Sequence, residues 1–182
     1  MNHETILLEL DEDYLAKQFN EVEKWFEHVS AIQTALETSI SKAIPEIKEP
    51  HIREAMEKML ESNKHHSKSL NELFNAIQRR PNEMSDKVMG SVMVSLQKNL
   101  VHLQDVIGGG GGSWVHLHVL LLVNQQAMGA IAVAEQLGLA LGMKEIVSIA
   151  FPIVHEKTMH QLLLQEYMLE MAPISILYKE DI

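Results

Sequence analysis

The stretch VHEKTMHQL, from Val154 to Leu162, differs by one inserted residue from the zinc-protease pattern His-Glu-x-x-His. In an α-helix each residue is rotated by about 100° from the one before it. His155 and His160 are five residues apart and therefore diverge by about 140°, too far to bind one ion from the same helix face. Glu156 and His160 are four residues apart and share a face. The pattern thus argues against a zinc-protease site and draws attention to Glu156 and His160.

The helix that carries Glu156 and His160 has an apolar stripe into which both fit. The stripe consists of Ile146, Ile149, Ile153, Leu163 and Tyr167. On this reading a carboxylate and an imidazole occupy two successive core positions. Burying a carboxylate or an imidazole without a partner costs several kcal/mol, so each of the two groups is expected to have a hydrogen-bond or metal partner.

Other segments with helical periodicity place polar side chains at a similar depth. Asn63 and His66 fall on the apolar face of the second helix, whereas Glu61 and His65 are predicted to lie on its surface. The remaining inward polar positions are Gln33 and Glu37, the latter at the edge of its stripe, and Gln125. Such a layer is where bundle proteins build metal sites, but a metal-free polar network has the same appearance in sequence.

The elements that position these residues are helices. Leu, Met, Ala, Glu, Gln and Lys dominate and β-branched runs are scarce, which favours helix over sheet. Proline and glycine signals divide the chain into predicted helices over 14–44, 51–79, 85–107, 113–141 and 144–171. The run of five glycines from Gly108 to Gly112 lacks the Lys-Ser/Thr of a phosphate loop and predicts a hinge. We therefore predict an all-α bundle of two antiparallel hairpins, with a short extra helix and a glycine-rich hinge between them.

Composition limits the class of function. The 182 residues are expected to form one domain, 1–182, and 25 Asp and Glu against 15 Lys and Arg give a formal charge of −10. This acidity disfavours nucleic acid and anionic membranes as partners. The absence of cysteine excludes disulfides and thiolate sites. The N-terminal segment lacks the features of a signal peptide, so a cytoplasmic location is expected.

The segment 113–141 is apolar nearly all round, so this helix should be buried on every side. Its length suits a membrane span, but Asn124, Gln125 and Gln126 in its middle argue against one. Burial in a large core or against a partner chain is the expected outcome.

Three segments carry a resemblance to a known family. They are ALETSISKAIPEI (35–47), LESNKHHSKSLNELF (60–74) and AVAEQLGLALG (132–142), and VHEKTMHQL follows on the next helix. Over about residues 20 to 171 the chain resembles the YciF-like bacterial stress proteins of the ferritin-like superfamily. The resemblance implies a ferritin-like four-helix bundle and a metal site in which Glu37 and Glu156 are the first-helix and last-helix carboxylates.

The chain also departs from the ferritin-like ligand pattern. That pattern requires Glu-x-x-His on two helices, but Asn63 precedes His66 and four residues separate Glu156 from His160. In the relatives the third long helix carries a carboxylate-rich segment. At the corresponding place this chain has the apolar residues 120–123. A single iron, manganese or zinc ion held by Glu37, His66, Glu156 and His160 is therefore expected in place of a di-iron centre.

Three functions remain open from the sequence. The first is a stress-associated ferritin-like protein with this atypical metal site. The second is a ferritin-like bundle without metal that acts as a structural or interaction protein, as a homodimer burying the apolar helix. The third is an enzyme or small-molecule binder that uses the polar layer, where a Glu156–His160 pair is suited to acid–base chemistry.

Overall fold

Two helical hairpins build the described part of the chain, which comprises residues 12–81, 94 and 112–178 of a computed structural model. The first hairpin is α1 (Glu12–Ala43) and α2 (Pro50–Ala76), and the second is α4 (Gly112–Ala140) and α5 (Lys144–Pro173). A 3-10 turn, η1 (Ile44–Glu46), joins α1 to α2, and a π-helical turn, η2 (Ile174–Tyr178), follows α5. The predicted all-α helical bundle is confirmed. The predicted helix 85–107 and glycine hinge lie outside the described residues, except that residue 94 is helical and Gly112 begins α4.

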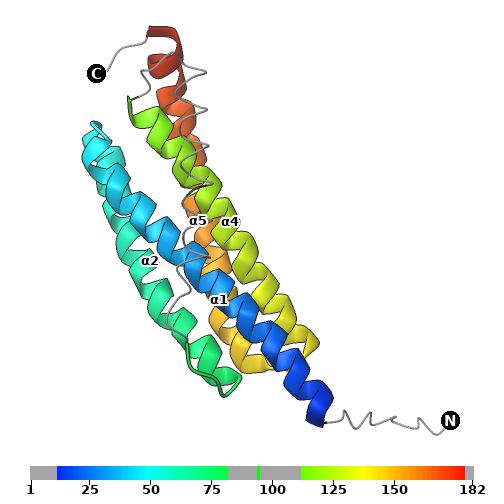
Figure 1. The fold of residues 1–182 in the computed structure, drawn as a ribbon. Helices are drawn as coiled ribbons and strands as arrows, with labels where there is room; N and C mark the ends of the chain where they lie inside the picture. The colour runs from blue at the N-terminus through cyan, green and yellow to red at the C-terminus, as the bar shows by residue number, and fades with distance from the viewer. Residues whose placement is uncertain (1–11, 82–93, 95–111, 179–182) are drawn as a thin grey trace, which may run out of the picture.

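The four long helices pack as a bundle in which each contacts two neighbours (Figure 1). α4 and α5 share the most extensive interface, α1 packs on α4 and α2, and α2 packs on α5. The N-terminal half of the chain therefore covers one side of the α4–α5 hairpin. This arrangement brings side chains from all four helices into the same interior.

Proline and glycine end the helices where the sequence indicates. Pro45 lies in η1 and Pro50 is the first residue of α2, a position where its missing N–H is not needed. Gly142 adopts a φ of 68° after α4. The amide of Met143 then donates to the carbonyl of Gly138 at 2.8 Å, which closes the helix end.

The core is formed by the inward faces of all four helices. It includes Phe26 and Phe74, whose rings meet edge to face at 5.8 Å between centroids. Met56, Leu117 and Ile146 are also completely buried. Polar residues interrupt this apolar interior at mid-length, and they form the candidate site.

Helix α4 is the described helix that is long and apolar enough to cross a membrane, by length and composition alone. In the bundle it packs against both α5 and α1, and the Trp25 indole N–H donates to the Ala130 carbonyl at 3.0 Å. Its exposed side includes Gln125, Gly129 and Gln136. Within the described residues of one chain, α4 is therefore not buried on every side, because α5 and α1 provide most of its contacts. Burial of its exposed side against a partner chain stays a prediction.

Gly138 of α4 allows the close approach of α5, and its replacement by alanine should destabilise the protein. A Cβ built on Gly138 would lie 2.8 Å from the Cβ of Ile146 and 3.2 Å from Cγ2 of Val147. We expect Gly138→Ala to lower the free energy of unfolding by about 1–3 kcal/mol in urea titrations.

Gly129→Ala is the matched control, since nothing lies within 4 Å of a Cβ built on Gly129. The control should stabilise α4 by about 0.5–1 kcal/mol. Equal effects of the two variants would contradict the packing role of Gly138.

Candidate functional site: a polar layer across the bundle

Three of the four predicted site residues lie together, on α2 and α5. His66 Nε2 is 2.8 Å from Glu156 Oε2, and His160 Nε2 is 4.0 Å from Glu156 Oε1. The two imidazole rings have centroids 6.3 Å apart. The hydroxyl of Ser62 donates to the other carboxylate oxygen, Glu156 Oε1. Glu156 is thus held between α2 and its own helix by groups that favour its ionised form.

Glu37, the fourth predicted site residue, is bonded to other partners. The hydroxyl of Ser67 donates to Glu37 Oε1, and Gln33 Nε2 lies 3.5 Å from the same oxygen. No hydrogen bond or ion pair joins Glu37 to His66, Glu156 or His160 among the described residues. The four predicted ligands are therefore split between a three-residue cluster and a separate carboxylate.

Lys157, which the sequence analysis did not single out, occupies the interior of this layer. It is 0% exposed, whereas the side chain of Glu156 is 49% exposed and that of His160 is 13% exposed. The prediction that Glu156 sits at a core position is therefore wrong. The buried line of α5 runs through Ile153, Lys157 and Leu164, in steps of four and seven residues. That spacing is the signal that could have identified Lys157, because residues four apart share a helix face with each other just as residues three apart do.

Asn63 connects Lys157 to α1. Lys157 Nζ donates to Asn63 Oδ1 at 2.7 Å, and Gln33 Nε2 donates to the same oxygen at 3.0 Å. The amide of Asn63 donates in turn to the Met59 carbonyl at 2.8 Å. The predicted inward position of Asn63, His66 and Gln33 is confirmed, since all three are buried.

Asn124 provides the contribution of α4 to the layer. Its amide nitrogen donates to the Lys157 carbonyl at 3.0 Å and to Gln161 Oε1 at 2.8 Å. Gln125, which was predicted to point inward, is exposed. The prediction failed because α4 is apolar on several sides, so its sequence gives no single inward direction. The exposed positions predicted for Glu61 and His65 are confirmed, and His155 is exposed as well.

Burial controls the protonation of this layer. It lowers the pKa of Lys157 from 10.5 to about 7, although Glu37 and Glu156 act in the opposite direction. It also lowers the pKa of His160 to about 4, with a further contribution from Lys157, and lowers the pKa of His66 despite the hydrogen bond to Glu156. Burial by itself would raise the pKa of Glu156, but the hydrogen bonds from Ser62 and His66 lower it overall. At neutral pH His66 and His160 are therefore neutral, Glu156 is ionised, and the Lys157 amine is close to its titration midpoint.

The geometry does not match a ready metal centre. Over residues 12–81, 94 and 112–178, no three His, Asp or Glu side chains converge closely enough to hold a metal ion. Glu37 lies apart from the cluster, and the ammonium of Lys157 competes for the same carboxylates. Among the described residues, two buried imidazole nitrogens, His66 Nδ1 and His160 Nδ1, nevertheless have no hydrogen-bond partner. After a rearrangement of the side chains, these two nitrogens are the atoms of the layer best suited to coordinate a metal ion through their lone pairs.

Fold and layer together define an all-α bundle of two helical hairpins crossed by a buried polar network. Two solved structures share this fold. The protein XCC3681 from Xanthomonas campestris is 13% identical, with a TM-score of 0.71, and the match covers 91% of this chain and 99% of that one. YcfI from Rhodopseudomonas palustris is 10% identical, with a TM-score of 0.67, covering 81% and 92% of the two chains. No family model and no curated protein match the sequence.

Proposed function

We propose that this protein is a ferritin-like bundle that acts as a structural or interaction protein, as a homodimer, with Lys157 in place of a metal ion. The observation that carries this proposal is the fully buried Lys157 amine in the mid-bundle layer, hydrogen-bonded to Asn63. Bundle proteins build metal sites from inward carboxylates and histidines at this depth. In its protonated form this amine, near Glu37 and Glu156, would repel a divalent cation, since charges at close range interact strongly in a buried environment.

The α4–α5 face supports the homodimer part of the proposal. We define it by the exposed residues Val133, Leu139, Phe151, Leu162 and Leu169. The last three lie within about 20° of one another around α5 and form one line. Glu135 is the only Asp, Glu, Lys or Arg in α4. On a chain with a formal charge of −10, the α4 part of this face, which carries few charges, is where two copies meet with the least repulsion.

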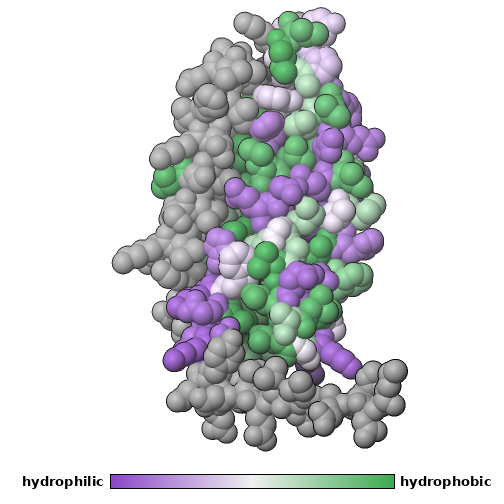
Figure 2. Space-filling model, turned by 90° about the vertical axis from the view of Figure 1, so that its right-hand side faces the viewer, coloured by the Kyte–Doolittle hydropathy of each residue, from purple (hydrophilic) through white to green (hydrophobic). Residues whose placement is uncertain are grey.

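The hydropathy of the surface agrees with this choice of interface. Figure 2 shows the side of the bundle that lies to the right in Figure 1, where hydrophobic side chains gather on either side of a hydrophilic band. Such patches on a soluble bundle are typical of protein–protein contacts. A second copy is the partner we propose for them.

Sedimentation equilibrium tests the dimer through one charge placed on the α4–α5 face. Leu162→Glu should convert a dimer into a monomer, because burying an unpaired carboxylate in an apolar interface costs several kcal/mol. Asn75→Glu introduces the same charge at an exposed position of α2 and should leave the dimer intact. A wild-type monomer at all concentrations, or dissociation by both variants, would contradict the proposal.

A second candidate function, metal binding in a stress-associated ferritin-like protein, is favoured by one observation. His66, Glu156 and His160 lie side by side, and the two histidines each keep an unpartnered buried nitrogen. Imidazole and carboxylate ligands of this kind suit zinc, iron or manganese. When bound, such an ion would supply Lewis-acid or redox chemistry to the layer.

Metal content separates the two candidates. We expect untagged protein, purified from cells grown with added iron, manganese and zinc, to contain far less than one metal per chain by mass spectrometry. A chelator should leave its melting temperature unchanged. Near-stoichiometric metal that is lost in Glu156→Ala/His160→Ala, but kept in the control His155→Ala, would establish the second candidate and overturn the first. His155 is the matched control because it neighbours Glu156 and is exposed.

A further inference from the structure

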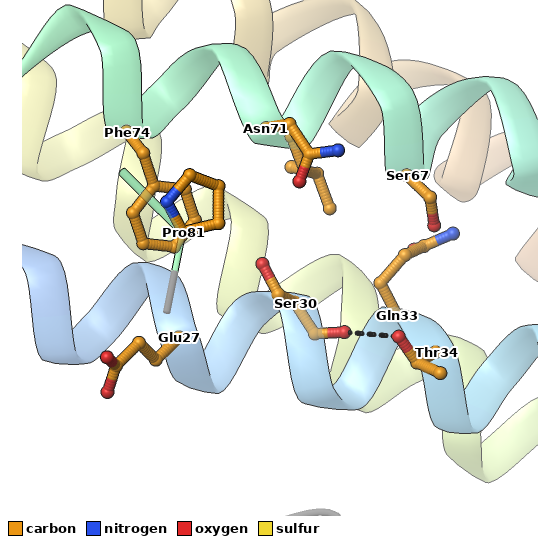
Figure 3. Close-up of a pocket in the computed structure, with 9 residues that line it drawn as sticks. Glu27, Ser30, Gln33, Thr34, Ser67, Asn71, Phe74 and Pro81 are labelled. Carbon is orange, nitrogen blue, oxygen red and sulfur yellow. Dashed lines mark hydrogen bonds between the residues drawn. The ribbon is translucent and has the colours of Figure 1, made fainter. Parts of the chain in front are cut away.

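A cavity of about 290 Å³ opens between α1 and α2, close to the polar layer. Its polar wall is formed by Ser30, Gln33 and Thr34 of α1 and by Ser67 and Asn71 of α2. Figure 3 shows the side chain of Gln33 extending from α1 towards Ser67, whereas Phe74 and Pro81 lie at the other end of the view. The volume is at the lower limit of small-molecule sites.

Three hydrogen-bond donors of this wall are committed to protein acceptors, whereas the Ser30 hydroxyl and the Asn71 amide have no such bond to a described residue. The Ser67 hydroxyl donates to Glu37, and the Thr34 hydroxyl donates to the Ser30 carbonyl at 2.9 Å, a bond drawn in Figure 3. The Gln33 amide nitrogen donates to the carbonyl of Asn63 at 2.9 Å and to its Oδ1 at 3.0 Å. Once these protons are committed, each group can offer a ligand only the lone pairs of its oxygen.

One acceptor in the wall is also unsatisfied. Gln33 is 1% exposed, and its Oε1 has no hydrogen-bond partner among the described residues. A buried acceptor without a donor is unfavourable, and a ligand N–H would satisfy it. Opposite these acceptors the wall is apolar, with Leu70 and the ring of Phe74. Glu27 adds a carboxylate to the wall, in a chain that is already strongly acidic.

We propose that this cavity binds a small organic cation of the alkylammonium class. Its ammonium group donates to Gln33 Oε1 and to the Ser67 hydroxyl oxygen, and its alkyl part packs on Leu70 and Phe74. The carboxylate of Glu27 and the oxygen lone pairs of Ser67 and Gln33 disfavour carboxylates and phosphates, whose oxygens would face other oxygens without a shared proton. The aromatic ring adds a cation–π contribution. The site is independent of the metal and dimer questions, since none of its wall residues belongs to the α4–α5 face or to the His66–Glu156–His160 cluster.

Titration of the full chain with three probes of equal chain length tests the chemistry. We expect n-butylammonium to give saturable shifts of the Leu70 methyl and Phe74 ring signals in NMR spectra. Butyrate and 1-butanol, at the same concentrations, should bind at least about tenfold more weakly, because neither carries the ammonium donors. Butyrate binding as tight as butylammonium, or the absence of saturable shifts with butylammonium, would overturn the proposal.

A matched pair of variants on α2 locates the binding. Asn71 lines the cavity and Asn75 does not, yet both are exposed and neither side chain hydrogen-bonds to a described residue. Asn71→Lys places a cation in the cavity and should weaken butylammonium binding roughly tenfold or more through like-charge repulsion. Asn75→Lys should leave the affinity within about twofold. Equal losses of affinity in the two variants would show that cation binding depends only on the net charge of the protein, which would overturn the proposed site.

Discussion

Replacing Lys157 by methionine is expected to stabilise the protein by about 1–4 kcal/mol at pH 7. A buried ammonium has lost its hydration, and well-packed apolar residues of similar size often stabilise a core in its place. Methionine matches the length of the lysine stem and adds no charge. Asn63 Oδ1 keeps one donor in the variant, because Gln33 Nε2 still reaches it at 3.0 Å. The free energy of unfolding in urea at constant pH measures the effect.

The same substitution should remove a specific pH dependence. The pKa of Lys157 is about 7 in the folded protein, against a reference value of 10.5 for the unfolded chain. Between these two pH values the unfolded chain binds one proton more than the folded protein, so stability rises with pH. The destabilising contribution is fully present below about pH 7 and disappears as the pH approaches 10.5. Wild type should gain on the order of 1 kcal/mol per pH unit relative to Lys157→Met from pH 7 to 9.

Lys64→Met provides the control for this experiment. Lys64 is an exposed lysine on α2 outside the layer. Its replacement removes the same charge from the chain, but it should change neither the stability by more than about 0.5 kcal/mol nor the pH slope. A Lys157→Met protein that is less stable than wild type at pH 7 and retains the wild-type slope would show that the Lys157 amine is charged and well paired when folded.

Replacing Asn63 by leucine should have the largest destabilising effect in the molecule, about 3 kcal/mol or more. Asn63 Oδ1 accepts hydrogen bonds from both Lys157 and Gln33. Leucine leaves the buried Lys157 amine without its partner, whereas Gln33 Nε2 keeps the backbone carbonyl of residue 63 at 2.9 Å. Asn75→Leu is the control, because this asparagine of the same helix is exposed. The control should remain within about 0.5 kcal/mol of wild type.

A double-mutant cycle tests whether the effect acts through the lysine. In the Lys157→Met background the ammonium is absent, so Asn63→Leu should cost less by at least about 1 kcal/mol. Urea unfolding of wild type, both single variants and the double variant supplies the four free energies. Strict additivity would contradict the role of Asn63 as the partner that accommodates the buried amine.

The sequence predicted the parts of this protein that depend on local conformational preferences. Pro45 and Gly142 mark helix ends because proline restricts the backbone and glycine tolerates the positive φ of 68° found at residue 142. On α2, whose polar and apolar faces are well separated, periodicity also identified Asn63 and His66 as inward polar residues. The all-α hairpin architecture follows from the same periodicity.

Only the tertiary structure decided which polar side chains of α4 and α5 enter the core. Asn124 is buried beside the exposed Gln125, and Lys157 is buried beside the half-exposed Glu156. Each pair differs by one residue, or about 100° of rotation, and helices with apolar side chains on several sides leave that rotation undetermined. The packing of α5 against both α4 and α2 selects it. That rotation brings an amine, in place of a carboxylate, to the centre of the bundle.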